Sequence, residues 1–240
     1  MNKLLLLLGL LLSTTAFARP KPSVVKLLQQ NTYHVITDNG SIGTGFTVQY
    51  ENKTIFVTNW HVCISAGGRN LGVVNDERKT YQLVKILYKD PAHDLCLAQA
   101  PKQTTKGLVI GMAPLPMDEI YSTGYPGTKG ELVLTWGHPL EEVLIALVYP
   151  YPGVECPKEF QSVKTDGHYV MCKRKLVVMD TTLIGEPGVS GSPVVDHEGK
   201  LVGVVNSTNY VPNNVNQVSS MVPVRFLREL LNSTSLILAF

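Results

Sequence analysis

The sequence has 240 residues, of which 44% are hydrophobic and 17% are charged, so it is long enough for one large or two small domains with a well-filled core. Its 21 basic and 19 acidic residues nearly balance, and no segment is a dense basic run. The composition therefore argues against nucleic acid or an anionic membrane surface as the partner, and we expect a polypeptide or a small molecule instead.

Residues 1–18 predict a signal peptide for export. A basic start at Lys3 is followed by an apolar run over 4–12 and by small residues that end at Ala18. The apolar run is too short for a membrane span, which needs about 20 helical residues. We expect cleavage after Ala18 and a secreted or periplasmic mature protein.

Residues 19–106 predict a first β-domain. Short runs rich in β-branched and aromatic residues alternate here with turn signals such as Asp38-Asn39-Gly40. The strand-like runs cover 23–28, 33–37, 45–50, 54–58, 71–74, 81–88 and 94–98. Asp94 opens the last of these runs among small and apolar residues, where a carboxylate is partly buried and needs hydrogen-bonding partners.

Residues 107–240 predict a second β-domain after a polar linker at 101–107. Its strand-like runs are short and separated by turns, and only Val224 to Leu231 has apolar residues at helical spacing. Many short strands with one terminal helix predict an all-β fold of barrels or sandwiches.

The four cysteines lack the C-x-x-C spacing of a metal site, and no metal or cofactor is expected. Cys156 and Cys172 bracket a segment rich in turn residues, so we predict a disulfide between them. For Cys63 and Cys96 a second disulfide and two buried free thiols are equally compatible with the sequence.

The segment Gly185 to Val195, GEPGVSGSPVV, predicts a nucleophile in a tight turn. Glycines flank Ser190 on both sides, and the strand-forming pair Val194-Val195 follows, so the backbone can direct its N–H groups around the serine hydroxyl. Serine is a weak nucleophile alone, and this prediction requires a base and an orienting carboxylate elsewhere in the chain.

Five motifs in order resemble trypsin-fold serine proteases, and most closely the HtrA-type bacterial branch. They are GTGF at 43–46, TNWHVC at 58–63, DPAHDLCLA at 90–98, TGYPG at 123–127 and GEPGVSGSPVV at 185–195. The resemblance implies two six-stranded antiparallel Greek-key barrels with a C-terminal helix. The implied catalytic residues are His61 as base, Asp94 as the orienting acid and Ser190 as nucleophile, with the N–H groups of Gly188 and Ser190 as the oxyanion hole.

The function implied is that of a secreted serine endopeptidase that cleaves a polypeptide substrate through an acyl-enzyme. The alternative is a catalytically silent module of the same fold that binds peptides or proteins, and an esterase is a third possibility. Ser192 competes with Ser190, and Asp90 with Asp94. His93 is a poor rival of His61, because neighbours on an extended chain point to opposite sides and Asp94 cannot readily orient it.

Two features depart from the family pattern. Val189 stands where trypsins activated by cleavage have an aspartate, so activation through a new N-terminus is not expected, and the residues after Leu231 are too few for the PDZ module of HtrA proteins. The resemblance also places an uncharged specificity pocket at Ile184, Asn206, Ser207 and Thr208. We therefore expect a preference for an aliphatic or small residue before the scissile bond.

Overall fold

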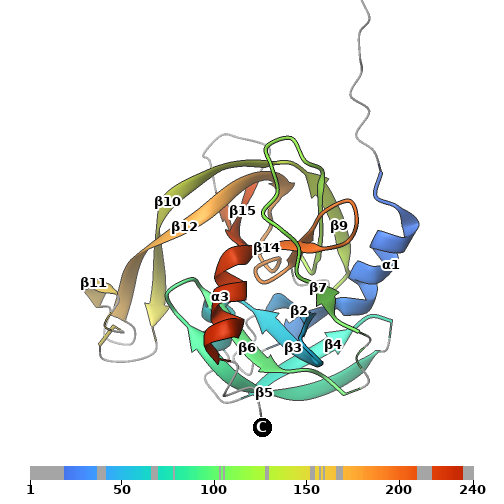
Figure 1. The fold of residues 1–240 in the computed structure, drawn as a ribbon. Helices are drawn as coiled ribbons and strands as arrows, with labels where there is room; N and C mark the ends of the chain where they lie inside the picture. Colours follow the sequence, from blue (N-terminus) through green and yellow to red (C-terminus); the bar gives the residue numbers. More distant parts are fainter. Residues whose placement is uncertain are drawn as a thin grey trace, which may run out of the picture.

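The computed structural model describes residues 19–36, 42–65, 70–77, 79–102, 104, 106–127, 130–151, 155–156, 158, 160–165, 170–209 and 218–234. The predicted signal peptide lies outside the described residues. The chain forms two mainly antiparallel sheets that pack against each other, with the helix at 224–234 lying across their junction and the helix at 22–31 at one side (Figure 1).

The first sheet closes into a barrel of six strands. In sheet order these are β1 (Thr32–Ile36), β4 (Asn70–Asn75), β5 (Thr80–Asp90), β6 (Leu95–Gln99), β3 (Lys53–Thr58) and β2 (Ile42–Tyr50). The barrel closes because β1 pairs with both β4 and β2. A two-residue strand, β7 (Leu108–Val109), adds to β2 in parallel.

The second sheet contains eight strands. They are β8 (Ile120–Gly124), β9 (Val133–Gly137), β10 (Pro139–Tyr151), β11 (Gln161–Thr165), β12 (Val170–Ile184), β13 (Pro193–Val195), β14 (Leu201–Asn209) and β15 (Val218–Pro223). The strand order of this sheet runs from β10 to β9. The sheet closes because β12, the neighbour of β10, also lies beside β9: the N–H of Thr182 in β12 donates to the carbonyl oxygen of His138, between β9 and β10, at 2.9 Å. The predicted two-barrel, all-β fold is confirmed, but the second sheet has eight strands instead of the expected six, because β9 and β10 are interrupted at His138 and β11 adds a further strand beside β12.

The paired segments 143–151 of β10 and 170–178 of β12, together with β11, extend away from the second barrel as an arm (Figure 1). A disulfide joins Cys156 to Cys172 within this arm, as predicted. The arm packs on the first barrel through Phe160, whose ring stacks on Trp60 with centroids 5.1 Å apart. A part of the second barrel thus covers the residue next to His61.

Three helices occur in the described chain: α1 (Pro22–Asn31), α2 (Trp60–Ser65) and α3 (Val224–Thr234). The expected helix at 224–231 is present as α3. The expected strand at 23–28 is wrong, because this segment forms α1. Pro22 occupies the start of α1, and Val24 and Leu28 lie one helical turn apart and are buried, so packing of one helix face outweighs the β-preference of the valines.

The largest hydrophobic cluster lies between the barrels rather than inside one of them. It joins Phe46 and Leu97 of the first barrel to Val204 and Val222 of the second, and apolar residues of α1 and α3 complete it. The interior of the first barrel also holds a disulfide between Cys63 and Cys96, which answers the question that the sequence leaves open. The two barrels are therefore packed by one continuous apolar core.

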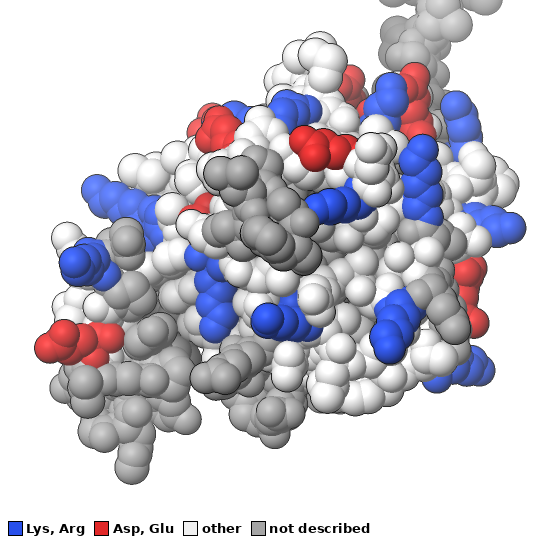
Figure 2. Space-filling model, turned by 60° about the horizontal axis from the view of Figure 1, so that its bottom comes forward, with Lys and Arg blue, Asp and Glu red and all other residues white. Residues whose placement is uncertain are grey.

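Basic and acidic side chains are scattered over the face seen in Figure 2, with uncharged surface between them. None of the described helices is both long enough and apolar enough to cross a membrane. Beyond β7, Ile110 makes an isolated bridge to Leu201 of the second sheet. The division of the chain at 106/107 stays a prediction.

Candidate active site

His61 and Asp94 form a hydrogen-bonded pair at the edge of the first barrel. Nδ1 of His61 lies 2.8 Å from Oδ2 of Asp94, and the backbone N–H of His61 donates to Oδ1 at 2.9 Å. The Asp94 side chain is 3% exposed, whereas the His61 side chain is 24% exposed. The carboxylate is therefore enclosed and accepts from the imidazole, while the ring retains access to solvent.

Asp94 is held by its backbone as well as by its side chain. Its φ is 55°, in the left-handed region that aspartate and asparagine tolerate better than most residues. Its carbonyl oxygen accepts hydrogen bonds from the side-chain amide of Asn59 at 3.0 Å and from the N–H of Trp60 at 3.1 Å. The start of α2 and the start of β6 are thereby fixed to each other, which sets the position of the His61 ring.

Residues 185–192, which we call the serine turn, need glycine at two positions. Gly188 has a φ of 102° and Gly191 a φ of 88°, both in the left-handed region. A Cβ at Gly188 would lie 2.4 Å from the carbonyl oxygen of Tyr125, and one at Gly191 would lie 2.0 Å from the carbonyl oxygen of Thr44. No side chain fits at either place, so glycine is required at positions 188 and 191 for this backbone path.

Asn206 connects the serine turn to the His61–Asp94 pair. The hydroxyl of Ser190 donates to the backbone carbonyl of Asn206 at 3.0 Å, and the side-chain amide of the same residue donates to Oδ2 of Asp94. Asn206 is 1% exposed. Because both bonds end on one residue, the serine hydroxyl and the aspartate carboxylate are bridged by the backbone and side chain of Asn206.

Thr44 holds the serine turn against the first barrel. Its N–H donates to the carbonyl oxygen of Ser190 at 2.8 Å, and its hydroxyl donates to that of Gly188 at 2.9 Å. The same hydroxyl accepts from the N–H of Tyr125 at 3.0 Å. Thr44, a buried residue of β2, thus binds the carbonyl groups of Gly188 and Ser190, on either side of Val189, and holds them against the first barrel.

Val189 is held by packing. It is 9% exposed and belongs to the hydrophobic cluster inside the second barrel, together with Leu183, Val194 and Val205. Its N–H donates to Glu186 O at 3.2 Å, and its carbonyl accepts from the N–H of Ser192 at 3.0 Å. Where a charged side chain would need an ion pair, this turn uses apolar contact and its own backbone hydrogen bonds.

The competing residues lie elsewhere or are enclosed. Ser192 is 1% exposed, which gives its hydroxyl no access to a substrate. Asp90 pairs with His93 at 2.8 Å, and the His93 ring stacks on Phe226 of α3, so these residues form a separate contact.

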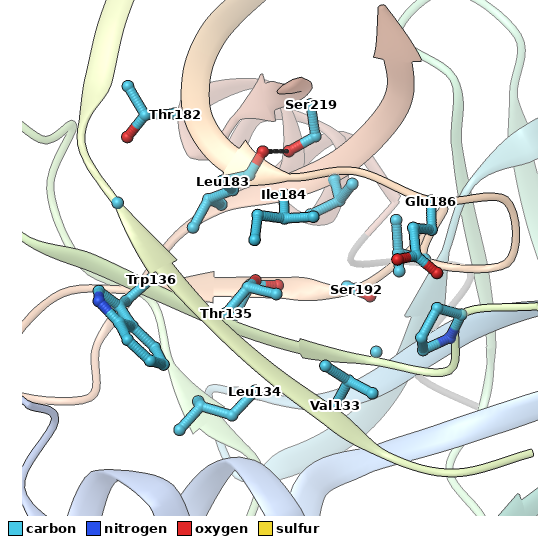
Figure 3. Close-up of a pocket in the computed structure, with 16 residues that line it drawn as sticks. Val133, Leu134, Thr135, Trp136, Thr182, Leu183, Ile184, Glu186, Ser192 and Ser219 are labelled. Carbon is cyan, nitrogen blue, oxygen red and sulfur yellow. Dashed lines mark hydrogen bonds between the residues drawn. The ribbon is translucent and has the colours of Figure 1, made fainter. Parts of the chain in front are cut away.

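The four residues expected to form a specificity pocket do not line one common pocket in the described structure. Ile184 lines a cavity of about 490 Å³ in the second barrel and is 59% exposed (Figure 3). Asn206 is directed to Asp94 instead. Ser207 and Thr208 lie in β14, and their side chains are outside the described residues.

Sequence reasoning gave no role to Thr44 or Asn59. Thr44 follows Gly43 in the motif GTGF, and Asn59 lies two residues before His61 in the motif TNWHVC. That position inside a motif was the available signal. The roles themselves depend on contacts with residues far along the chain, Gly188 for Thr44 and Asp94 for Asn59.

A family model described as "Trypsin-like peptidase domain" matches residues 43–204, which include His61, Asp94 and Ser190. No curated protein matches the sequence.

Solved structures share the fold at low identity. The Rv3671c protease from M. tuberculosis in its active form has 20% identity and a TM-score of 0.63, with 90% of this chain and 87% of that chain covered. The HtrA-type protease AlgW with a tripeptide has 16% identity and a TM-score of 0.62, covering 89% and 64%. The serine endoprotease from Yersinia pestis has 14% identity and a TM-score of 0.63, covering 90% and 67%. The family model matches residues 43–204, which is more than half of this chain. The chain therefore belongs to the trypsin-like peptidase family.

Proposed function

We propose that the protein is an exported serine endopeptidase that cleaves polypeptides through an acyl-enzyme, with Ser190 as nucleophile, His61 as general base and Asp94 as the orienting acid. The observation that carries the proposal is the contact of Asp94 with Nδ1 of His61. This contact places the ring proton on Nδ1, so the other ring nitrogen, Nε2, is left as the base.

In the acylation step, the oxygen of Ser190 attacks the carbonyl carbon of the scissile peptide bond while its proton passes to Nε2 of His61. The C=O electrons move to the oxygen and form a tetrahedral oxyanion. When this species collapses, the C–N bond breaks, and the leaving amine takes the proton from His61. The product is an ester between Ser190 and the N-terminal half of the substrate.

In the deacylation step, a water molecule gives a proton to His61 and attacks the ester carbonyl. Collapse of the second tetrahedral species releases the carboxylic acid and returns the proton to the oxygen of Ser190. The negative Asp94 carboxylate stabilises the imidazolium formed in both steps, and its enclosure among hydrogen-bond donors keeps it in place.

We assign the oxyanion hole to the backbone N–H groups of Gly188 and Ser190. In the described part of the chain, neither group donates to another protein atom. The carbonyl groups that share a peptide unit with these N–H groups are those of Pro187 and Val189, and they accept from the N–H groups of Gly127 at 2.7 Å and Ser192 at 3.0 Å, which restricts rotation of both peptide units. Loss of one such donor typically costs about 10²- to 10³-fold in rate.

The hydroxyl of Ser190 donates to Asn206 in the free protein, so the reaction requires a rotation about one side-chain bond to bring it to His61. Such a rotation between staggered conformations is fast compared with turnover, and hydrogen bonds of the catalytic groups often tighten only when substrate is bound.

The test is labelling by a fluorophosphonate, followed by peptide mapping. Wild-type protein should be labelled at Ser190 and should hydrolyse a peptide substrate, whereas Ser190→Ala should lose labelling and retain only a small residual rate. Ser233→Ala, at the end of α3, is the matched serine control and should behave as wild type. Folded wild-type protein that binds peptides but is neither labelled nor active would support the silent binding module instead.

Export is part of the proposal. Both cysteine pairs are oxidised in the structure, and disulfides persist in compartments outside the reducing cytosol. A cleaved signal peptide at 1–18 and a preference for aliphatic or small residues before the scissile bond stay predictions.

A further inference from the structure

Asp94 ends the turn that joins β5 to β6. Asp90 and Leu95 are the last paired residues of the two strands, so the chain reverses its direction over residues 91–94. At the end of this reversal Asp94 adopts its left-handed φ of 55°. A residue with a side chain keeps such a backbone conformation where the surrounding structure enforces it. The shape of this turn therefore depends on the contacts of its neighbours.

Asp90 holds the turn from the side of the first barrel. Its Oδ1 accepts a hydrogen bond from the N–H of Ala92 at 2.8 Å, and its Oδ2 accepts one from Nδ1 of His93 at 2.8 Å. An aspartate that binds the backbone two residues further on closes a turn locally. The second bond fixes the direction of the His93 ring, because the Asp90 side chain is only 12% exposed and is itself held by the first bond.

α3 holds the same turn from the side of the second barrel. The Phe226 ring, in the first turn of α3, stacks on the His93 ring with centroids 4.3 Å apart and an angle of 20° between the planes. α3 follows β15 directly and lies across the junction of the barrels (Figure 1). The residue before Asp94 is thus packed against an element of the other barrel.

Phe226 is in turn fixed to the second barrel. The Arg225 guanidinium lies 4.5 Å from the centroid of the Phe226 ring, and it donates two hydrogen bonds to the carboxylate of Glu142 in β10. Phe226 also packs against the apolar core between the barrels. With these contacts the ring offers a fixed surface to the imidazole of His93.

We propose that His93 is a positioning residue for Asp94 and acts through the backbone of the turn. Its imidazole is held by the Asp90 carboxylate and by the Phe226 ring, and one peptide unit joins His93 to Asp94. A fixed imidazole restricts this peptide unit, and the Asp94 carboxylate stays at Nδ1 of His61. The effect on rate rests on the proposed catalytic function.

The kinetic test compares His93→Ala with His197→Ala, which removes an exposed histidine from the turn after β13. His93→Ala should lower kcat about tenfold or more and change KM less than about twofold, because a displaced Asp94 no longer orients His61. Fluorophosphonate labelling of Ser190 should slow by the same factor. His197→Ala should keep the wild-type values, and a change confined to KM in His93→Ala would overturn the proposal.

The stacking contact is tested at Phe226. Phe226→Ala should lower kcat about threefold or more, and the double variant with His93→Ala should be no slower than His93→Ala alone, since one contact is removed by either change. Phe226→Tyr keeps an aromatic ring and should retain most of the wild-type kcat. Independent, multiplicative losses in the double variant would contradict an action through this pair.

The hydrogen bond to Asp90 is tested with two further pairs of variants. His93→Phe keeps a ring for stacking but has no donor for Asp90, so its kcat should lie between those of the wild type and His93→Ala. Asp90→Ala should lower kcat, whereas Asp90→Asn keeps an acceptor for Ala92 and a polar group beside the imidazole and should restore most of it. Thermal unfolding identifies folded variants. If His93→Ala does not fold, a wild-type kcat in His93→Phe would overturn the proposal.

A spectroscopic readout separates this proposal from the proposed function. In protein with isotopically labelled histidine, the Nδ1 proton of His61 should give a strongly deshielded NMR signal, because it is bound to the Asp94 carboxylate. The signal should be present in Ser190→Ala and lost in His93→Ala. If wild-type protein cleaves no peptide, the proposed function fails, yet loss of the signal in His93→Ala still establishes the positioning role. An unchanged signal in His93→Ala would overturn that role even in an active enzyme.

Discussion

At the scale of single residues, Asn206 contributes to the candidate active site through two different groups. Its backbone carbonyl accepts a hydrogen bond from the Ser190 hydroxyl, and its side-chain amide donates one to the carboxylate of Asp94. Since the residue is buried, no water can replace the amide without a rearrangement. We therefore regard Asn206 as a positioning residue that keeps Asp94 oriented toward His61.

We predict that Asn206→Ala lowers kcat/KM by about 10- to 100-fold, mainly in kcat, because a hydrogen bond to a charged group contributes about 1.5 to 3 kcal/mol. Steady-state kinetics should separate kcat from KM, and thermal unfolding should show that the variant is folded. Asn232→Ala, which removes an exposed amide on α3, is the control. A change confined to KM would argue that Asn206 contacts the substrate instead.

The residues of the site were predictable where a motif carries them. His61, Asp94 and Ser190 stand in quoted motifs, and the glycines beside Ser190 have a backbone reason that sequence already indicates. The direction of the Asn206 side chain was not predictable. It depends on the approach of β14 to Asp94, a contact between residues 112 positions apart.

At the scale of elements, the arm links the second barrel to the helix that carries His61. Phe160 stacks on Trp60, Arg174 lies over the Phe160 ring at 5.3 Å, and Cys172 packs in the same cluster. The disulfide between Cys156 and Cys172 lies near the far end of the arm, where Cys172 pairs with Tyr149. The position of α2 is consequently supported from both barrels.

We predict that Phe160→Ala lowers the free energy of unfolding by about 3 kcal/mol, since it removes a buried ring. It should also expose Trp60, so that the emission of this tryptophan shifts to longer wavelength in a Trp136→Phe background. Urea unfolding and fluorescence measure the two effects. Phe226→Ala removes a ring that does not stack on Trp60 and should leave the emission maximum in place; an unshifted maximum in Phe160→Ala would contradict the role of the arm.

The elements show where local sequence misleads. The paired valines of 23–28 favour a strand, yet Val24 and Leu28 become buried one helical turn apart and the segment is helical. The apolar residues of α3 have helical spacing throughout, so local pattern and tertiary packing agree there. Prediction failed where packing and local preference conflict.

At the scale of the whole molecule, the barrels meet at an aromatic contact near the serine turn. The His34 ring of β1 stacks on Tyr125 with centroids 4.9 Å apart, and the carbonyl of Tyr125 borders Gly188. Burial lowers the pKa of His34 below its usual value, and the nearby Asp76 carboxylate opposes this effect only in part. The contact between the barrels thus favours a neutral histidine.

We predict that stability falls as the pH drops below about 6.5, the ordinary pKa of histidine in an unfolded chain. The unfolded state then binds a proton that the folded state resists, so the free energy of unfolding decreases toward acid pH. Urea unfolding at several pH values measures this dependence. His34→Gln should flatten the curve between pH 6.5 and the lowered pKa, and an unchanged curve would assign the effect to another group.

The all-β class was predictable from the short strands and turns that recur along the whole chain, and the two-barrel arrangement from the family resemblance that the five motifs carry. The closure of the second sheet and the apolar core between the barrels were not, since both depend on contacts between distant segments such as His138 with Thr182. Sequence therefore indicated the architecture and left the packing of its two halves open.

The hydrogen bond from Thr44 to Gly188 joins residues 144 positions apart and has a consequence for the order of folding. A chain made from its N-terminus completes β2 long before the serine turn exists, and contacts distant in sequence form late because they close long loops. The first barrel must then serve as the surface on which the turn acquires its final shape. A nascent or truncated chain without β2 would therefore lack the contacts that hold the serine turn in its observed shape.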